Sequence, residues 1–147
     1  MLKFKITKWN NDKLVNPSIV SFFNKEAKIT NNYIKTKTDL YFEVVIIDKN
    51  AMRRLNRNYR KVDKATDVLS FALHDAKQSI WTELLGEIYL CPDYINEICK
   101  KENKFFDYEI TLTFVHGLLH LLGYDHANKK DEQAMFKLQK EITGDAF

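Results

Sequence analysis

The stretch DYEITLTFVHGLLHLL, residues 107–122, is apolar on nearly every side when it is drawn as a helix. Half of its residues are Ile, Leu, Phe or Val, and they occur on nearly every side of the helix. A helix of this kind must be covered by other elements on most sides. Gly123 follows it directly and is suited to end it in the left-handed conformation. The sequence therefore predicts a central helix around which the fold is built.

In the rest of the sequence, predicted strands and helices are intermixed without strict alternation. β-branched and aromatic residues predict strands at residues 2–7, 40–48, 66–73 and 85–91. Asn16-Pro17 opens a helix to about residue 28, and Asp48 caps one to about Tyr59, with Met52, Leu55 and Tyr59 expected on its inner face. Two further helices are expected at residues 92–101 and 129–142. We predict one α+β domain over residues 1–147, in which a small mixed four-stranded sheet packs against about five helices.

Composition agrees with one folded domain and narrows its cellular setting. The 147 residues are 45% hydrophobic and 29% charged, which excludes a disordered chain. The N-terminal residues MLKFKITKWN alternate lysine with apolar residues and contain no long apolar run. We therefore expect a cytoplasmic protein without a membrane partner. Cys91 and Cys99 form no metal-binding pattern and are expected to be reduced thiols.

The arginines are concentrated in one segment. The chain has 23 Lys and Arg residues, of which only four are Arg, and all four lie between Arg53 and Arg60. On a helix, Arg53, Arg57 and Arg60 lie within about 60° of one another. This clustering indicates a local role for guanidinium groups, although a solvated helix face is the simpler alternative.

Three of the four histidines lie in HGLLHLLGYDH, residues 116–126. His116 and His120 are one turn apart on the same helix face, and the break at Gly123 lets the chain bring His126 back toward them. Three imidazoles leave the fourth tetrahedral position of a zinc ion open for water, which is typical of catalytic zinc sites. The alternative is a set of buried, hydrogen-bonded histidines. His74 is expected to be an ordinary loop histidine.

The histidine spacing also matches the metzincin proteases, with one difference. Those proteases carry a Glu after the first histidine as the general base, whereas this chain has Gly117. Glycine cannot accept a proton, so a conventional metzincin peptidase is not expected.

The string HGLLHLLGYDH, together with LNRNYRKVDKATDVLSF (residues 55–71) and LGEIYL (residues 85–90), resembles the YbeY family of endoribonucleases. The resemblance implies a zinc-dependent endonuclease of single-stranded RNA that matures the 3′ end of small-subunit rRNA and acts in late-stage ribosome quality control. It implies one zinc ion per chain held by His116, His120 and His126, a functional arginine at Arg60, and the ribosomal small subunit as partner. Ala72 stands where the family pattern has proline.

Several points stay open at this stage. The nucleophile on phosphorus is either water or the neighbouring ribose 2′-OH. Arg60 is expected to stabilise charge on the phosphate oxygens, and nearby cations are candidates for a phosphate-binding surface, namely Arg53, Arg54, Arg57, Lys61 and Lys64. Asp125 is a candidate to orient His126. A hydrolase of another substrate and a noncatalytic ribosome-associated factor remain as alternatives.

Overall fold

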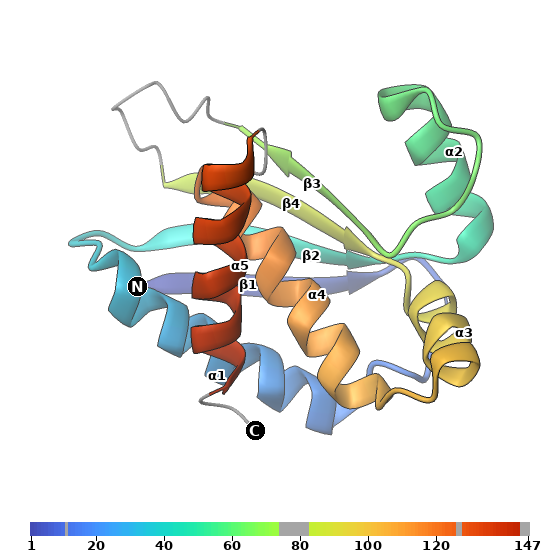
Figure 1. The fold of residues 1–147 in the computed structure, drawn as a ribbon, viewed down its shortest axis with the longest axis horizontal. Coiled ribbons are helices and arrows are strands. Elements are labelled where there is room, and N and C mark those ends of the chain that lie inside the picture. The colour runs from blue at the N-terminus through green and yellow to red at the C-terminus, as the bar shows by residue number, and fades with distance from the viewer. Residues whose placement is uncertain (11, 74–82, 126–127, 145–147) are drawn as a thin grey trace.

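Four strands form one mixed sheet in the order β1-β2-β4-β3 (Figure 1). The computed structural model describes residues 1–10, 12–73, 83–125 and 128–144. The strands are β1 (Leu2–Lys8), β2 (Leu40–Ile46), β3 (Val68–Ala72) and β4 (Leu84–Leu90). β2 runs parallel to β1 and β4, whereas β3 runs antiparallel to β4 and forms one edge of the sheet. The predicted strands and the mixed sheet are confirmed.

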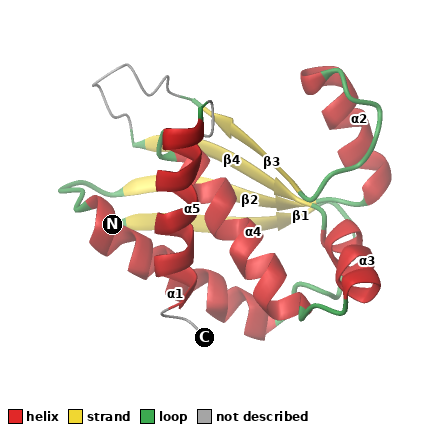
Figure 2. Ribbon diagram, in the orientation of Figure 1, coloured by secondary structure: helices red, strands yellow, loops and turns green. Residues whose placement is uncertain are grey.

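The described residues also form five helices, which completes the predicted α+β fold. They are α1 (Pro17–Ile34), α2 (Lys49–Arg60), α3 (Pro92–Glu102), α4 (Phe106–Leu121) and α5 (Lys129–Gly144). Figure 2 shows α1, α4 and α5 together against one side of the sheet. No helix within the described ranges combines the length and the apolarity that crossing a membrane requires.

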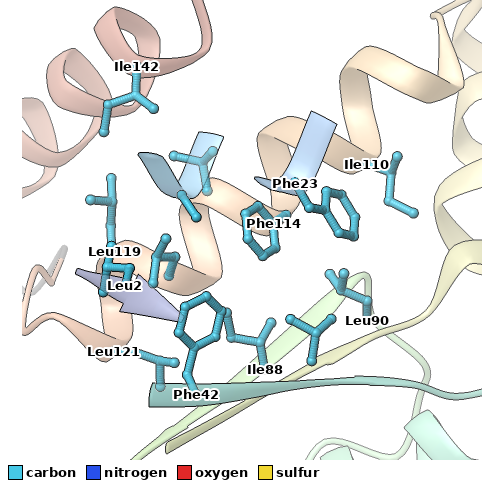
Figure 3. Packing of buried hydrophobic residues seen from close by; sticks show 14 of the residues in the cluster. Leu2, Phe23, Phe42, Ile88, Leu90, Ile110, Phe114, Leu119, Leu121 and Ile142 are labelled. Carbon is cyan, nitrogen blue, oxygen red and sulfur yellow. The ribbon is translucent and has the colours of Figure 1, made fainter. Parts of the chain in front are cut away.

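Helix α4 lies at the centre of the fold, as its composition predicts. It contacts β3, β4, α1, α3 and α5. Its Phe114 is fully buried and stacks on Phe23 of α1, with the ring centroids 4.3 Å apart (Figure 3). Burying an aromatic side chain of this size stabilises the fold by about 1.5–3 kcal/mol. The core therefore fixes the position of α4 from several directions.

Helix α2 packs on the opposite face of the sheet. Val45, Tyr89 and Leu69 form one row across β2, β4 and β3, and this row packs with Met52 of α2. Successive side chains of a strand point to opposite faces. The neighbouring row contains Ile88, which belongs to the core cluster that includes the residues of α4. The sheet therefore separates α2 from α4.

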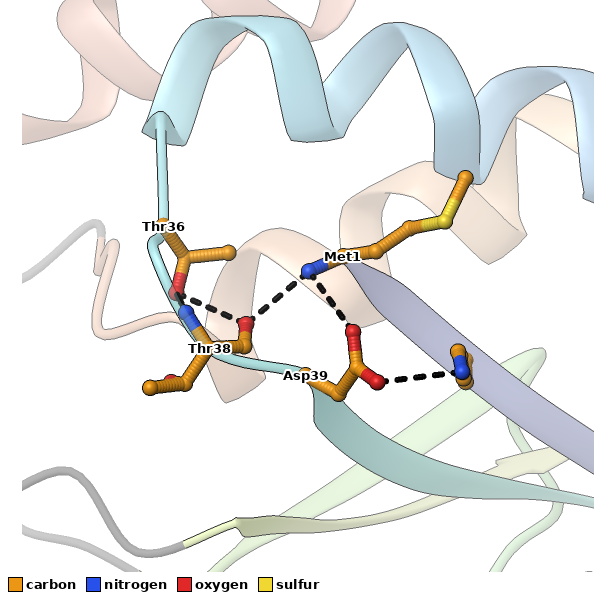
Figure 4. Close-up of polar contacts among 5 residues, drawn as sticks. Met1, Thr36, Thr38 and Asp39 are labelled. Carbon is orange, nitrogen blue, oxygen red and sulfur yellow. Dashed lines mark hydrogen bonds and ion pairs between the residues drawn. The ribbon is translucent and has the colours of Figure 1, made fainter.

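The start of β2 is tied to β1 by polar contacts around Asp39 (Figure 4). The Asp39 carboxylate pairs with Lys3 Nζ at 3.0 Å, and the hydrogen bond from Lys3 lowers the pKa of Asp39 below its usual value. The amino group of Met1 donates to the Thr38 carbonyl oxygen at 2.9 Å. These exposed contacts fix register and add little stability, because solvent screens them.

Two sequence expectations about helices are wrong. Helix α1 continues to Ile34 instead of ending near residue 28, because Ala27 and Thr30 extend its buried face. Helix α2 buries Asn56 in place of Tyr59, whose side chain is 65% exposed. Asn56 Nδ2 donates to the Lys64 carbonyl oxygen at 2.8 Å, so the helix presents this amide to the chain that leads into β3.

The cysteines agree with the expectation of reduced thiols. Cys91 and Cys99 are both free and buried. Burial raises the pKa of the Cys91 thiol to about 11, which leaves almost no thiolate at neutral pH. Neither residue is therefore a candidate nucleophile.

Candidate functional site

His116 and His120 lie together on the half-buried side of α4. Their Nε2 atoms are 3.2 Å apart, and their ring centroids are 4.7 Å apart. Two imidazole nitrogens that bind one tetrahedral zinc ion at 2.0–2.1 Å are about 3.3 Å from each other. The geometry of this histidine pair therefore fits a shared zinc ion.

Gln139 of α5 orients the first of these imidazoles. Its Oε1 lies 2.8 Å from His116 Nδ1, and only 8% of the Gln139 side chain is exposed. An amide oxygen can only accept, so Nδ1 carries the hydrogen and the Nε2 lone pair points toward His120. Metal-binding histidines commonly have such a partner on the second ring nitrogen.

Sequence reasoning missed Gln139, although a signal was present. The predicted last helix has a buried apolar stripe that includes Met135 and Ile142, and Gln139 lies on that stripe. A polar residue among buried apolar ones needs a hydrogen-bond partner. The histidine motif could supply this partner, but only the packing of α5 on α4 shows that His116 is the partner of Gln139.

Helix α4 ends as predicted, just after the histidine pair. Gly123 has φ of 97°, a left-handed conformation that glycine adopts without strain. Its N–H bonds the His120 carbonyl oxygen at 3.1 Å, and the Tyr124 N–H bonds the Leu119 carbonyl oxygen at 3.0 Å. This is a Schellman motif, and it turns the chain away from the helix axis.

The rest of the predicted metal set extends beyond the described residues. His126, the third predicted ligand, lies outside them, and so does His74, which is not one of the predicted ligands. Within the described ranges, no group of three or more His, Cys, Asp and Glu side chains is suited to hold a metal ion. Asp125 is exposed at the end of the described segment. A metal ion on the histidine pair thus requires a further ligand, and the predicted one is His126.

Gly117 packs against the sheet rather than beside the imidazoles. A Cβ atom at this position would lie 2.9 Å from Ile88 Cγ2 and 3.2 Å from Val68 Cγ2 and Ser70 Oγ. The Ser70 hydroxyl donates to the Gly117 carbonyl oxygen at 3.0 Å. The position that carries the general base in metzincins therefore faces the sheet here, where a Cβ atom would be crowded.

The arginines of α2 fall into two groups. Arg53 Nε bonds Asp63 Oδ1 at 2.9 Å, and Arg57 Nη1 lies 3.8 Å from the same oxygen. The hydrogen bond from Arg53 lowers the pKa of Asp63 below its usual value. Arg60 ends the helix, is exposed, and makes no ion pair with any residue in the described part of the chain. Its guanidinium therefore remains available to an anionic ligand.

Strand β3 separates the histidine pair from Arg60. Ser70 contacts Gly117 of α4, and the next residue, Phe71, packs its ring on Tyr59 with centroids 4.9 Å apart. Consecutive side chains of the strand thus touch the two helices on opposite faces. No hydrogen bond or ion pair between described residues joins Arg60 to either histidine. The two candidate groups lie on either side of one edge strand.

Comparisons with known proteins identify the family of this chain. The family model for endoribonuclease YbeY matches residues 5–146. An endoribonuclease YbeY from Ureaplasma parvum serovar 3 is 37% identical over 145 residues, which cover 96% of this chain and 87% of the relative. Another from Staphylococcus carnosus is 37% identical over 129 residues, covering 85% and 80%.

The fold has a known structural counterpart as well. The solution structure of a protein from Thermotoga maritima matches with a TM-score of 0.68 at 28% identity, covering 99% of this chain and 89% of that one. The family match spans both the histidine helix and the arginine helix, so it applies to the candidate site as a whole. The chain belongs to the YbeY family of endoribonucleases.

Proposed function

We propose that residues 1–147 form one metal-dependent hydrolase domain, a zinc-dependent endoribonuclease specific for single-stranded RNA. Its substrate is the 3′ end of small-subunit rRNA, and it acts in the cytoplasm on the ribosomal small subunit during late-stage maturation and quality control. The observation that carries the proposal is the 3.2 Å separation of the His116 and His120 Nε2 atoms. The family's name as an endoribonuclease supplies the substrate class.

In this proposal, His116, His120 and His126 hold one zinc ion. When bound, zinc supplies Lewis-acid chemistry, because it acidifies water and stabilises negative charge on phosphate oxygens. Gln139 keeps His116 in the tautomer whose Nε2 lone pair is available. The buried helix α4 holds the first two imidazoles in place before RNA binds, which lowers the cost of assembling the site.

Arg60 is the phosphate-binding group of the proposed site. Its guanidinium can donate two parallel hydrogen bonds to phosphate oxygens, and charge grows on these oxygens during phosphoryl transfer. Because β3 lies between Arg60 and the histidines, the RNA backbone would pass over the edge of this strand. Single-stranded RNA is flexible enough to do so, whereas a duplex is not.

The close packing of Gly117 argues against a peptidase. The general base of that mechanism would have to occupy a position where a Cβ atom lies 2.9 Å from Ile88 Cγ2. A noncatalytic ribosome-associated factor is the other alternative, and it would use zinc only for stability.

The proposal is tested by measuring the zinc content of each purified variant together with its cleavage of a 5′-labelled single-stranded RNA. Wild type is compared with His120→Ala and Arg60→Ala, all prepared identically. Lys28→Ala, which removes an exposed cation of α1, is the control for Arg60→Ala, and His74→Ala is the control for His120→Ala.

We expect about one zinc ion per chain in wild type. His120→Ala should lose both zinc and cleavage, and Arg60→Ala should lose cleavage while keeping zinc. If both variants cleave as fast as wild type, the nuclease is a contaminant and the noncatalytic alternative gains support. The product ends identify the nucleophile, since attack by the 2′-OH leaves a 2′,3′-cyclic phosphate and attack by water does not.

A further inference from the structure

A cavity lies beside the histidine pair, along the same side of α4. It has a volume of about 250 Å³, is open to solvent on one side, and is lined by α3, α4 and the segment that enters β3. Glu109 and Thr113 line it from α4. On a helix, both residues fall within about 60° of His116 and His120, and Thr113 is one turn before His116. Along the helix axis, Thr113 is therefore about 5 Å and Glu109 about 11 Å from His116.

The polar groups of this cavity accept hydrogen bonds. The Thr66 hydroxyl donates to Asp67 Oδ1 at 3.2 Å, and the Thr113 hydroxyl donates to the Glu109 carbonyl oxygen at 2.7 Å. Each hydroxyl hydrogen is thereby used, so both Oγ1 atoms face a ligand as acceptors. Asp67 Oδ1 also accepts from the Val68 N–H at 2.8 Å. These bonds fix the Asp67 carboxylate in one orientation.

The two carboxylates of the cavity have accepting capacity to spare. Within the described residues, no hydrogen bond reaches Asp67 Oδ2 or the carboxylate of Glu109. Lys104 also lines the cavity; its ammonium group pairs with Glu102 Oε2 at 2.8 Å, and this bond, helped by the nearby charge of Glu109, raises its pKa. With two carboxylates and one ammonium group in the lining, a ligand that supplies hydrogen-bond donors suits the cavity better than a phosphate group, which only accepts.

The remaining wall is apolar and aromatic. It is made by four side chains of α3, namely Tyr94, Ile95, Ile98 and Cys99. A flat ring fits such a wall, and unpaired RNA bases are commonly held by stacking on aromatic residues together with hydrogen bonds to their edges. The cavity is smaller than the pockets of drug-sized ligands, so a single base suits it better than a larger group.

We propose that this cavity binds one base of the RNA substrate, next to the cleaved phosphate, and that it selects bases with an exocyclic amino group. The inference rests on the proposed ribonuclease function and adds its base specificity. Adenine, cytosine and guanine each offer an amino group to the carboxylates of Asp67 and Glu109. Uracil has a carbonyl oxygen where cytosine has the amino group, so the carboxylates repel that oxygen and only the N3–H of uracil can donate to them.

Cytidine and uridine form the matched pair of probes, because they differ only at that edge of the base. Each nucleoside is titrated into the zinc-loaded, isotope-labelled protein while amide NMR signals are followed. We expect cytidine to shift the signals of Thr66, Cys99 and Thr113, with uridine binding about tenfold more weakly. This readout needs no cleavage, so it tests the cavity even if the ribonuclease proposal fails.

Two variants assign the selectivity to the carboxylates. Asp67→Asn keeps an oxygen that accepts from Val68 and Thr66 but replaces the second carboxylate oxygen with an amino group, which donates. The preference of the cavity should therefore shift toward uridine. Glu109→Gln should weaken cytidine binding. Asp107→Asn is the control, because Asp107 is also in the first turn of α4 but is exposed and does not line the cavity.

The same variants are then compared in cleavage of a pool of single-stranded RNAs with randomised sequence. Wild type should avoid uridine at one position beside the cut by about tenfold, and Asp67→Asn should lose this avoidance. The inference is overturned if the two nucleosides bind equally, if only an amine or a metal cation shifts the signals, or if Asp67→Asn and Glu109→Gln leave the preference unchanged. Absence of zinc-dependent cleavage in wild type would instead contradict the proposed function.

Discussion

Helices α4 and α2 carry the two halves of the candidate site, and they are held in opposite ways. Helix α4 is surrounded by two strands and three helices, and eight of its residues are buried. Helix α2 buries only Met52 and Asn56 and is fixed largely at its ends. Its N-terminus is capped by the Asp48 side chain, which accepts from the Ala51 N–H at 2.8 Å.

This difference suits the two tasks that we propose. Metal ligands must converge within a few tenths of an ångström, which requires a packed and rigid support. A group that binds a flexible RNA backbone benefits from an exposed, adjustable side chain. We therefore expect changes on α4 to affect stability and metal binding together, and changes at the exposed arginines of α2 to affect activity alone.

The largest expected effect comes from Arg60→Ala. Removing a group that stabilises transition-state charge lowers kcat by about 100- to 1,000-fold. The free energy of unfolding should stay unchanged, because Arg60 is exposed and makes no ion pair within the described ranges. Steady-state cleavage of single-stranded RNA and urea denaturation measure the two quantities. If Arg60→Ala also lowered the free energy of unfolding, the contrast between α4 and α2 would be lost.

Gln139→Leu tests the support of the metal site. Loss of the hydrogen bond to His116 Nδ1 should weaken zinc binding by about 10- to 100-fold. Gln139→Glu keeps an acceptor at the same place and should retain most of the affinity. Competition with a chelator of known affinity measures both variants. Equal zinc binding by Gln139→Leu and wild type would show that Gln139 has no part in orienting the imidazole.

Gly117→Ala tests the packing of α4 on the sheet. The new Cβ atom would meet Ile88 Cγ2 at 2.9 Å, so strands or helix must shift. Overpacking costs about 1–3 kcal/mol, and the better helix propensity of Ala returns about 1 kcal/mol. We expect a net loss of up to about 2 kcal/mol in the free energy of unfolding, measured with urea.

Gly144→Ala is the matched control for this experiment. Gly144 is likewise a helical glycine, the last residue of α5, but nothing lies within 4 Å of a Cβ atom built there. The free energy of unfolding of Gly144→Ala should equal that of wild type or be slightly higher. If Gly117→Ala is as stable as Gly144→Ala, α4 is less tightly packed than we describe.

The smallest effect concerns Asp63, the partner of Arg53 and Arg57. Its pKa lies below the ordinary value of 3.8, so its stabilising contribution is present above pH 3.8 and is lost as the pH falls through the folded-state pKa. All three side chains are exposed, and solvent screens the pair. Asp63→Asn should therefore change the urea midpoint only slightly at neutral pH, and not at all in strong acid.

Sequence reasoning succeeded best for α4. The apolar periodicity of residues 107–122, the histidine spacing and Gly123 each report a local property, and local properties are visible in the sequence. The structure confirms the helix, its central place and its C-terminal motif. The convergence of His116 and His120 follows directly from helix geometry.

Long-range contacts explain what could not be predicted. Leu55 packs with Met52 on the inner face of α2, as periodicity predicts. The same pattern predicts Tyr59 on that face, but the backbone near Lys64 needs a donor and Asn56 supplies it. The contact between Gln139 and His116 joins two helices, and the position of Arg60 across β3 depends on how the sheet is assembled. None of these follows from local patterns.

Zinc add-back to chelator-treated protein tests the central claim most directly. The rate of single-stranded RNA cleavage is measured as zinc is added to wild type and to His120→Ala from identical preparations. We predict that wild type without zinc is inactive, that its activity returns with about one zinc ion per chain, and that His120→Ala stays inactive throughout. Cleavage by zinc-free wild type, or equal recovery by His120→Ala, would contradict a zinc site built on the histidines of α4.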